Sequence, residues 1–291
     1  MPDFRPVLLV IGLFVAALGA AMVIPILADI GADDAAARAD QQAFLASAAL
    51  CLTIGGGLAG ASWGRVETIT TRQGFLLTTG AWLALVFAAA LPMRLGSADL
   101  SFTDAFFEAM SGLTTTGATV VTGLDDMPRG FLLWRSMLQW FGGVGVIIMA
   151  IAILPFLSIG GMQLFRLESS DRSDKIVPAA DDLALQIFWL YSVMTLMCFA
   201  CYWAAGMTSF DALNHAMTTV ATGGYSTKDM SFGYFTQVGV TQGPVELIAV
   251  IFMIAGSLPF GVYLLALRGR TAALVTDGQV RFFIVAVLVF T

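Results

Sequence analysis

Long runs of apolar residues, separated by short polar segments, occupy most of the chain. A helix needs about 20 consecutive apolar residues to cross the roughly 30 Å of hydrocarbon in a bilayer. Six runs are close to this length: 6–27, 43–63, 75–91, 131–157, 183–205 and 245–267. A seventh begins near Phe282 and is still running at Thr291. The first run is too long for the core of a signal peptide, so the pattern predicts an all-α polytopic membrane protein in the lipid bilayer.

One segment between the apolar runs recurs 107 residues later. The two copies, 104–119 and 211–226, align without gaps and share six identical positions. Each begins with a Ser/Thr-x-x-Asp sequence typical of a helix start, at Ser101 and at Thr208. A mostly apolar stretch follows each start and is too short to cross the membrane, and a Thr-x-Gly sequence follows it. We therefore predict two half-membrane helices, each followed by a re-entrant pore loop.

The composition of these loops suits a site for a dehydrated cation. The carboxyl end of a helix carries about half a negative charge, and carbonyl oxygens can replace the water around an ion. Glycine tolerates the positive φ that turns neighbouring carbonyls to one side, and threonine adds hydroxyl oxygens. The predicted ion ligands are Thr115, Thr116, Gly117, Thr222, Gly223 and Gly224. A Gly/Thr turn between ordinary membrane helices is the alternative.

The runs and loops divide the chain into five expected segments. Two complete units of helix, pore loop and helix follow an amino-terminal helical hairpin, and a third unit begins before the end of the sequence. The segments are an amino-terminal two-helix hairpin (1–67), the first repeat (68–160), a cytoplasmic connector (161–182), the second repeat (183–268), and a connector with the start of a third, truncated repeat (269–291).

Charged residues indicate an orientation and exclude several classes of function. Nine of the 14 Lys and Arg residues lie on the side of the amino terminus, which predicts a cytoplasmic amino terminus and outward-facing loops. Arg135 is one of the five assigned to the outer side. A net charge of −6 argues against nucleic acid as a partner. Three cysteines in apolar runs form no disulfide framework, and we find no motif of a catalytic nucleophile, so we expect no enzyme.

Three stretches, 109–119, 134–145 and 216–226, resemble the TrkH family of potassium-uptake subunits, within the Trk/Ktr/HKT superfamily. The resemblance covers the amino-terminal portion of that family. It implies a four-fold pseudosymmetric pore with four filter loops, each holding one filter glycine, here Gly117 and Gly224. Relatives that prefer sodium often have Ser at the first filter glycine, so Gly117 favours potassium.

The resemblance also implies partners and a location. Potassium is the expected substrate, with no bound cofactor, and the expected partners are a TrkA-like cytoplasmic nucleotide-binding regulatory subunit and a second copy in a homodimer. The expected location is the bacterial cell inner membrane. With two of four repeats, the chain resembles an amino-terminal fragment. The alternatives are a sodium or mixed monovalent cation transporter of the same superfamily, or a non-conducting truncated fragment; symport with protons or sodium, and gating, stay open.

Several residues near the loops are candidates for supporting roles. Asp104 and Glu108 share one helix face and suit either attraction of cations or, for Asp104, a helix cap. His215, the only histidine, aligns with Glu108 and suits either a structural hydrogen bond or a pH sensor. Gly142-Gly-x-Gly145 suits either close helix packing or a bend. The remaining candidates flank the two filters: Thr114, Ala118, Ala221 and Tyr225.

Overall fold

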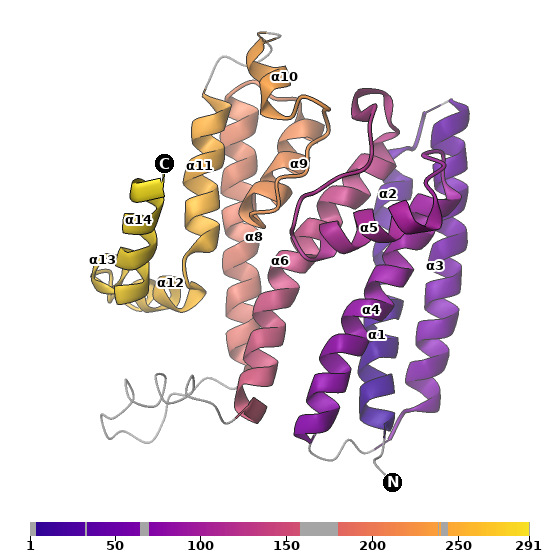
Figure 1. The fold of residues 1–291 in the computed structure, drawn as a ribbon, viewed down its shortest axis with the longest axis horizontal. Coiled ribbons are helices and arrows are strands. Elements are labelled where there is room, and N and C mark those ends of the chain that lie inside the picture. Colours follow the sequence, from indigo (N-terminus) through magenta and orange to yellow (C-terminus); the bar gives the residue numbers. More distant parts are fainter. Residues whose placement is uncertain are drawn as a thin grey trace.

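The computed structural model describes residues 4–32, 34–64, 70–157, 180–237, 239 and 244–290. Every regular element in these residues is a helix, and the bundle divides into two groups on either side of one long helix (Figure 1). The first group contains α1 (Arg5–Ala21), α2 (Val23–Ala28), α3 (Ala35–Ala61), α4 (Thr71–Leu95) and α5 (Phe102–Leu113). The predicted all-α architecture is confirmed.

Helices α1 and α2 continue in one direction and together form the first apolar span, Arg5–Ala28, with a short interruption at Met22. The span packs against α3 through small residues. A Cβ on Gly12 would lie 2.7 Å from the carbonyl oxygen of Gly55, and a Cβ on Gly55 would lie 2.6 Å from that of Gly12. The two backbones approach this closely because neither position has a side chain, as is common between helices in membranes.

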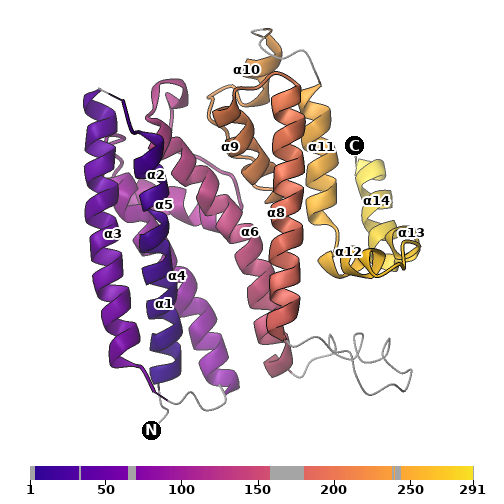
Figure 2. The same cartoon turned by 180° about the vertical axis from the view of Figure 1, so that it is seen from behind.

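The long helix between the two groups is α6 (Arg129–Leu157). Figures 1 and 2 show it between α1–α5 on one side and α8–α14 on the other. It packs against α5 of the first group and against α8 (Ala180–Ala204) and α9 (Ser209–Val220) of the second. Both short helices, α5 and α9, therefore lie against the same long helix.

The second group continues with α10 (Phe232–Gln237), α11 (Val245–Ser257), α12 (Phe260–Leu267), α13 (Ala273–Thr276) and α14 (Gly278–Phe290). The sequence predicts a single span over 245–267, and the structure divides this run into two helices. Helices α11 and α12 meet at an angle of 87°. Pro259 has no N–H to continue α11, and Leu258 before it is extended, with ψ 148°.

Four helices in the described part of the chain are long and apolar enough to cross a membrane: Arg5–Ala28, Ala35–Ala61, Arg72–Leu95 and Leu183–Ala204. The bent pair α11 and α12 makes a fifth if it is counted as one span. The prediction of a polytopic membrane protein is confirmed. Most of the expected connector at 161–182 lies outside the described residues, and the five-segment division remains a prediction.

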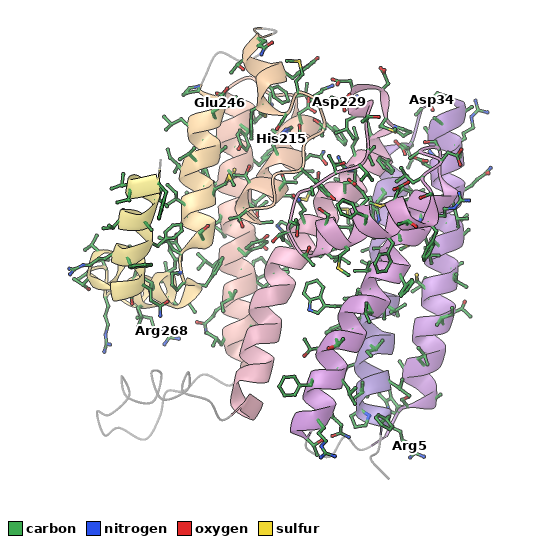
Figure 3. All side chains as sticks on the ribbon, in the orientation of Figure 1. Arg5, Asp34, His215, Asp229, Glu246 and Arg268 are labelled. Atoms are coloured by element: carbon green, nitrogen blue, oxygen red, sulfur yellow. The ribbon has the colours of Figure 1, made fainter. Side chains whose placement is uncertain are left out.

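Figure 3 separates the labelled charged residues into two ends of the bundle. Arg5 lies at the lower end and Arg268 in the lower half, whereas Asp34, Asp229 and Glu246 lie toward the upper end. This is the grouping expected from the charge pattern. The end that faces the cytoplasm remains a prediction.

Candidate ion-binding site

Each short helix is capped by the residue that the sequence indicates. The Ser101 Oγ accepts a hydrogen bond from the Asp104 N–H at 3.1 Å and donates one to Asp104 Oδ2 at 2.6 Å. Thr208 and Asp211 make the same pair of bonds in the second copy, at 3.1 and 2.7 Å. Asp104 thus holds the start of α5, as expected for a cap residue.

The chain after each short helix takes an unusual conformation at equivalent positions. We call these segments loop 1 (114–119) and loop 2 (221–226). Thr115 and Gly117 have φ of 55° and 78° in loop 1, and Thr222 and Gly224 have 56° and 80° in loop 2. Positive φ is unusual for a β-branched residue and is typical of strained functional segments. Alternation of positive and negative φ turns successive carbonyls to one side, as an ion site requires.

The first four backbone N–H groups of each loop bond back to the short helix before it. In loop 1 the Thr116 N–H donates to Ser111 O at 2.9 Å. In loop 2 the Gly223 N–H donates to Thr218 O at 2.8 Å. Within the described residues, no hydrogen bond is directed at the main-chain carbonyl oxygens of the six predicted ligands, and their role as ion ligands remains a prediction: Thr115, Thr116, Gly117, Thr222, Gly223 and Gly224.

The two loops touch each other. A Cβ on Gly117 would lie 1.8 Å from the carbonyl oxygen of Gly223, which no side chain allows. Gly117 thus needs to be glycine for two reasons, its φ and this contact. Gly224 has the same φ class but open space around it. Segments 107 residues apart in sequence therefore lie in direct contact.

A buried ion pair lies behind the loops. Arg135 Nε is 2.8 Å from Glu108 Oε1, and the two side chains are 1% and 0% exposed. Arg135 also donates to Thr119 Oγ1 in loop 1 at 3.1 Å and to Ser226 O in loop 2 at 3.0 Å, and its guanidinium lies 4.2 Å from the centre of the Tyr225 ring. Arg135 lies near the start of α6 and joins both loops, and its assignment to the outer side remains a prediction.

Glu108 is directed at the backbone and side chains of loop 1 rather than at open space. It accepts hydrogen bonds from Thr119 Oγ1 at 2.9 Å and from the Val120 N–H at 3.1 Å. The Tyr225 hydroxyl of loop 2 donates to the main-chain oxygen of Glu108 at 2.9 Å. With its charge paired to Arg135, Glu108 holds the loop in place.

His215 makes the structural hydrogen bonds that we considered for it. Its Nδ1 is 2.8 Å from Asp211 O, and its Nε2 is 3.0 Å from Ser226 Oγ. A carbonyl only accepts, so Nδ1 donates and Nε2 accepts from the serine hydroxyl. The ring is 1% exposed and packs edge-on against Phe235. His215 thus fixes the end of loop 2 as Glu108 fixes the end of loop 1.

The flanking candidates lie at the ends of the short helices. Thr114 Oγ1 donates to Met110 O at 2.7 Å, and the Ala118 carbonyl accepts from Ser111 Oγ at 2.6 Å. Ala221 begins loop 2, and a Cβ on Gly143 of α6 would lie 3.2 Å from its methyl group.

The glycine pair of α6 serves close packing. A Cβ on Gly142 would lie 2.0 Å from Leu113 O, at the carboxyl end of α5. A Cβ on Gly143 would lie 2.4 Å from the Tyr191 hydroxyl. Gly145 has nothing within 4 Å of its Cβ position. The packing interpretation therefore holds for the first two glycines.

Outside the loops, a set of contacts that we call the outer clasp joins the two copies. The Asp229 carboxylate accepts from the Gly123 N–H at 2.9 Å and from the Leu124 N–H at 3.1 Å. Asp125 accepts from the Asp229 N–H at 3.2 Å, and its carboxylate is 3.4 Å from Lys228 Nζ. These aspartates connect the segments that follow the two loops.

Sequence reasoning missed the roles of Arg135 and Gln139. Both lie on α6, four residues apart and therefore on one face. Gln139 is fully buried, and its Oε1 accepts from the Tyr225 N–H at 3.1 Å. The available signal was Glu108 in an otherwise apolar stretch, because a buried carboxylate requires a paired cation.

The chain is similar to proteins of known description. Residues 40–290 match the family model TrkH, described as a cation transport protein. The chain is 38% identical over 285 residues to the Trk system potassium uptake protein TrkH of Escherichia coli K12, covering 97% of this chain and 57% of that protein. It is 41% identical over 227 residues to the Trk system potassium uptake protein TrkI of Halomonas elongata, covering 78% of this chain and 45% of that protein.

A solved structure shares the fold. The crystal structure of the potassium transporter TrkH from Vibrio parahaemolyticus matches with a TM-score of 0.84 and 33% identity, over 97% of this chain and 56% of that chain. The chain therefore spans about half the length of the curated relatives that it matches.

Proposed function

Because this chain belongs to the TrkH family of cation transport proteins, we propose that the complete protein carries potassium ions across a membrane through a carbonyl filter. Loops 1 and 2 supply part of that filter. Thr115, Thr116 and Gly117 offer oxygens from loop 1, and the equivalent residues of loop 2 offer theirs. Potassium is the cargo named for the relatives from Escherichia coli and Halomonas elongata.

One observation carries this proposal. Both loops take the same alternating backbone conformation, and the first four N–H groups of each bond to the short helix before it. The carbonyl oxygens of the described loops then stay without protein donors and can replace the water shell of a cation. The carboxyl ends of α5 and α9 add partial negative charge beside the loops.

Potassium is favoured over sodium by the surroundings of Gly117. Its Cβ position is 1.8 Å from Gly223 O, so a serine there would force the two loops apart. The filter therefore depends on glycine at this position, which the family resemblance associates with potassium. A sodium or mixed cation transporter is the competing outcome.

The test replaces Gly117 with alanine in the complete protein and measures potassium uptake in cells that lack their own uptake systems. We expect uptake to fall at least about tenfold, which corresponds to about 1.4 kcal/mol. The matched control is Gly123→Ala, because Gly123 has φ 77° with nothing within 4 Å of its Cβ position. Both alanines bear the left-handed strain of about 1–2 kcal/mol, and only one disturbs the loop contact.

Two outcomes would contradict the proposal. Wild-type protein that supports sodium uptake and no potassium uptake would replace potassium with sodium as cargo. Equal activity of the two alanine variants would remove Gly117 from the filter.

The remaining features of the proposal follow the resemblance. We place the amino terminus and Arg268 on the cytoplasmic side of a bacterial inner membrane, where a TrkA-like nucleotide-binding subunit would reach that end. A homodimer of the complete protein belongs to the same proposal. The position of both Arg5 and Arg268 in the lower half of the bundle supports the orientation (Figure 3).

A further inference from the structure

We propose that Gln139 is a specificity-determining residue of the filter, which positions loop 2 and sets its spacing from loop 1. This inference rests on the proposed function. Gln139 itself touches the loops and not the transported ion, so its role is positioning.

The first observation is the bond between Gln139 and loop 2. The Tyr225 N–H donates to Gln139 Oε1 at 3.1 Å, and the side chain is fully buried. Tyr225 directly follows Gly224, so this bond fixes the chain at the exit of the predicted ligand sequence. It also assigns the amide orientation, because only the oxygen can accept from Tyr225.

The second observation is the contact between Gln139 and Gly223. A Cβ on Gly223 would lie 2.4 Å from both Cδ and Oε1 of Gln139, and 2.7 Å from Nε2. Gly223 is absent from the residues with positive φ, so its backbone would accept alanine. Glycine is required here because the Gln139 amide occupies the place of a side chain. On its other side, the Gly223 carbonyl meets Gly117.

The third observation is the amide nitrogen of Gln139. It is buried and has no hydrogen-bond partner among the described residues. An unpaired buried donor is unfavourable for stability. Within the described residues, the Gln139 amide therefore acts on loop 2 through its oxygen, which accepts from Tyr225.

These contacts place Gln139, Gly223 and Gly117 in one continuous row from α6 to loop 1. A change at Gln139 moves the Gly223 carbonyl, and with it the distance between the oxygens of the two loops. Selection between potassium and sodium depends on the arrangement and number of such oxygens. The row thus connects a side chain of α6, the helix between the two groups, to the choice of ion.

The test compares potassium and sodium uptake by the complete protein carrying Gln139→Met, which keeps the length of the side chain and removes its hydrogen bonds. We expect the potassium-to-sodium uptake ratio to fall about tenfold, which corresponds to about 1.4 kcal/mol. The substitution also leaves the buried Tyr225 N–H without its acceptor, so we expect the thermal unfolding temperature to fall while the protein still folds.

The control is Ser136→Ala on the same helix. Ser136 is also buried, and its hydroxyl bonds only within the helix, to Leu132 O at 3.2 Å. We expect its uptake ratio to stay within twofold of the wild type. A Gln139→Met ratio within twofold of the wild type would overturn the inference, and so would a fall that Ser136→Ala reproduces.

A second pair of variants applies if Gln139→Met does not reach the membrane. Gly223→Ala should lower potassium uptake because its methyl group meets Gln139, and Gln139→Ala added to it should restore part of the uptake. If the uptake losses of Gly223→Ala and Gln139→Ala simply add in the double variant, the inference is overturned. Wild-type protein without potassium uptake would instead defeat the proposed function, so the two failures are distinguishable.

Discussion

Two threonines, 107 residues apart, hold a conformation that β-branched residues avoid. The surrounding bonds explain how they persist. The Thr115 N–H donates to Gly112 O and the Thr222 N–H to Thr219 O, each at 2.9 Å. Each bond closes the carboxyl end of a short helix, so the strain is spread over a capped helix end. Strained residues of this kind persist where function requires them.

Glu108 and Arg135 lead to a prediction about stability. Arg135→Met should lower the free energy of unfolding in detergent by about 3–5 kcal/mol, because it leaves the Glu108 carboxylate buried and unpaired. The double variant Glu108→Gln/Arg135→Met should recover part of this loss. Denaturant titrations of purified protein measure both.

The control for this prediction is an exposed pair. Arg94 is 3.8 Å from Asp99, and their side chains are 49% and 97% exposed. Arg94→Met should cost less than about 1 kcal/mol. Equal losses for the Arg94 and Arg135 variants would show that the buried pair contributes no more than a surface pair.

At the residue scale, the sequence indicates the two loops better than the buried contacts that hold them in place. The Thr-x-Gly repeats and the caps at Ser101 and Thr208 can be read directly, because local hydrogen bonds determine them. The partner of Glu108 lies 27 residues away on another helix, and only the packing of α5 on α6 brings them together. No local pattern marks that contact.

At the scale of elements, α6 is the support on which both loops rest. It carries Arg135, Gln139 and the close-packed Gly142 along one helix. Its side chains reach loop 1 and loop 2 together. A rotation or shift of α6 would therefore move the two loops as a unit.

Gly142→Ala tests the packing of α6. The added methyl group would lie 2.0 Å from Leu113 O, so we expect a loss of about 1–3 kcal/mol in the free energy of unfolding. Potassium uptake should fall as well, because α5 is displaced. Gly145→Ala is the control, since its Cβ position is open and alanine favours a helix by about 1 kcal/mol. A Gly142→Ala variant with unchanged free energy of unfolding and unchanged potassium uptake would contradict the close contact.

The bend between α11 and α12 shows the limit of hydropathy at this scale. The run 245–267 is apolar apart from Glu246 near its start and Ser257, and it predicts one span. A hydropathy pattern is insensitive to the missing N–H of Pro259, which ends the helix and redirects the chain by 87°. Pro259 can be read in the sequence, but an apolar run does not show that the helix bends there.

At the scale of the whole molecule, the apolar runs were sufficient to predict the fold class. Lipid leaves a segment of this length few options besides a helix. The order of the helices around α6 could not be predicted, because it depends on the small-residue contacts of pairs such as Gly12 and Gly55. The repeated segment predicts the two loops, and the family resemblance implies their arrangement in a four-fold pseudosymmetric pore.

Orientation in the membrane is the prediction at this scale. We expect Met230→Cys, next to Asp229, to react with a membrane-impermeant maleimide in intact cells, and Arg270→Cys, near Arg268, to react only after permeabilisation. The background has Cys51, Cys198 and Cys201 replaced by alanine, because all three are free thiols. The reverse labelling pattern would invert the proposed topology.

The outer clasp has a consequence for how the chain holds together. Asp229 binds the Gly123 and Leu124 N–H groups across more than 100 residues of sequence, and α6 packs against α9 beneath it. Neither contact needs a covalent connection between residues 157 and 180. If the protein were produced as two polypeptides, one ending after residue 157 and one beginning before residue 180, we expect the two to bind each other and assemble.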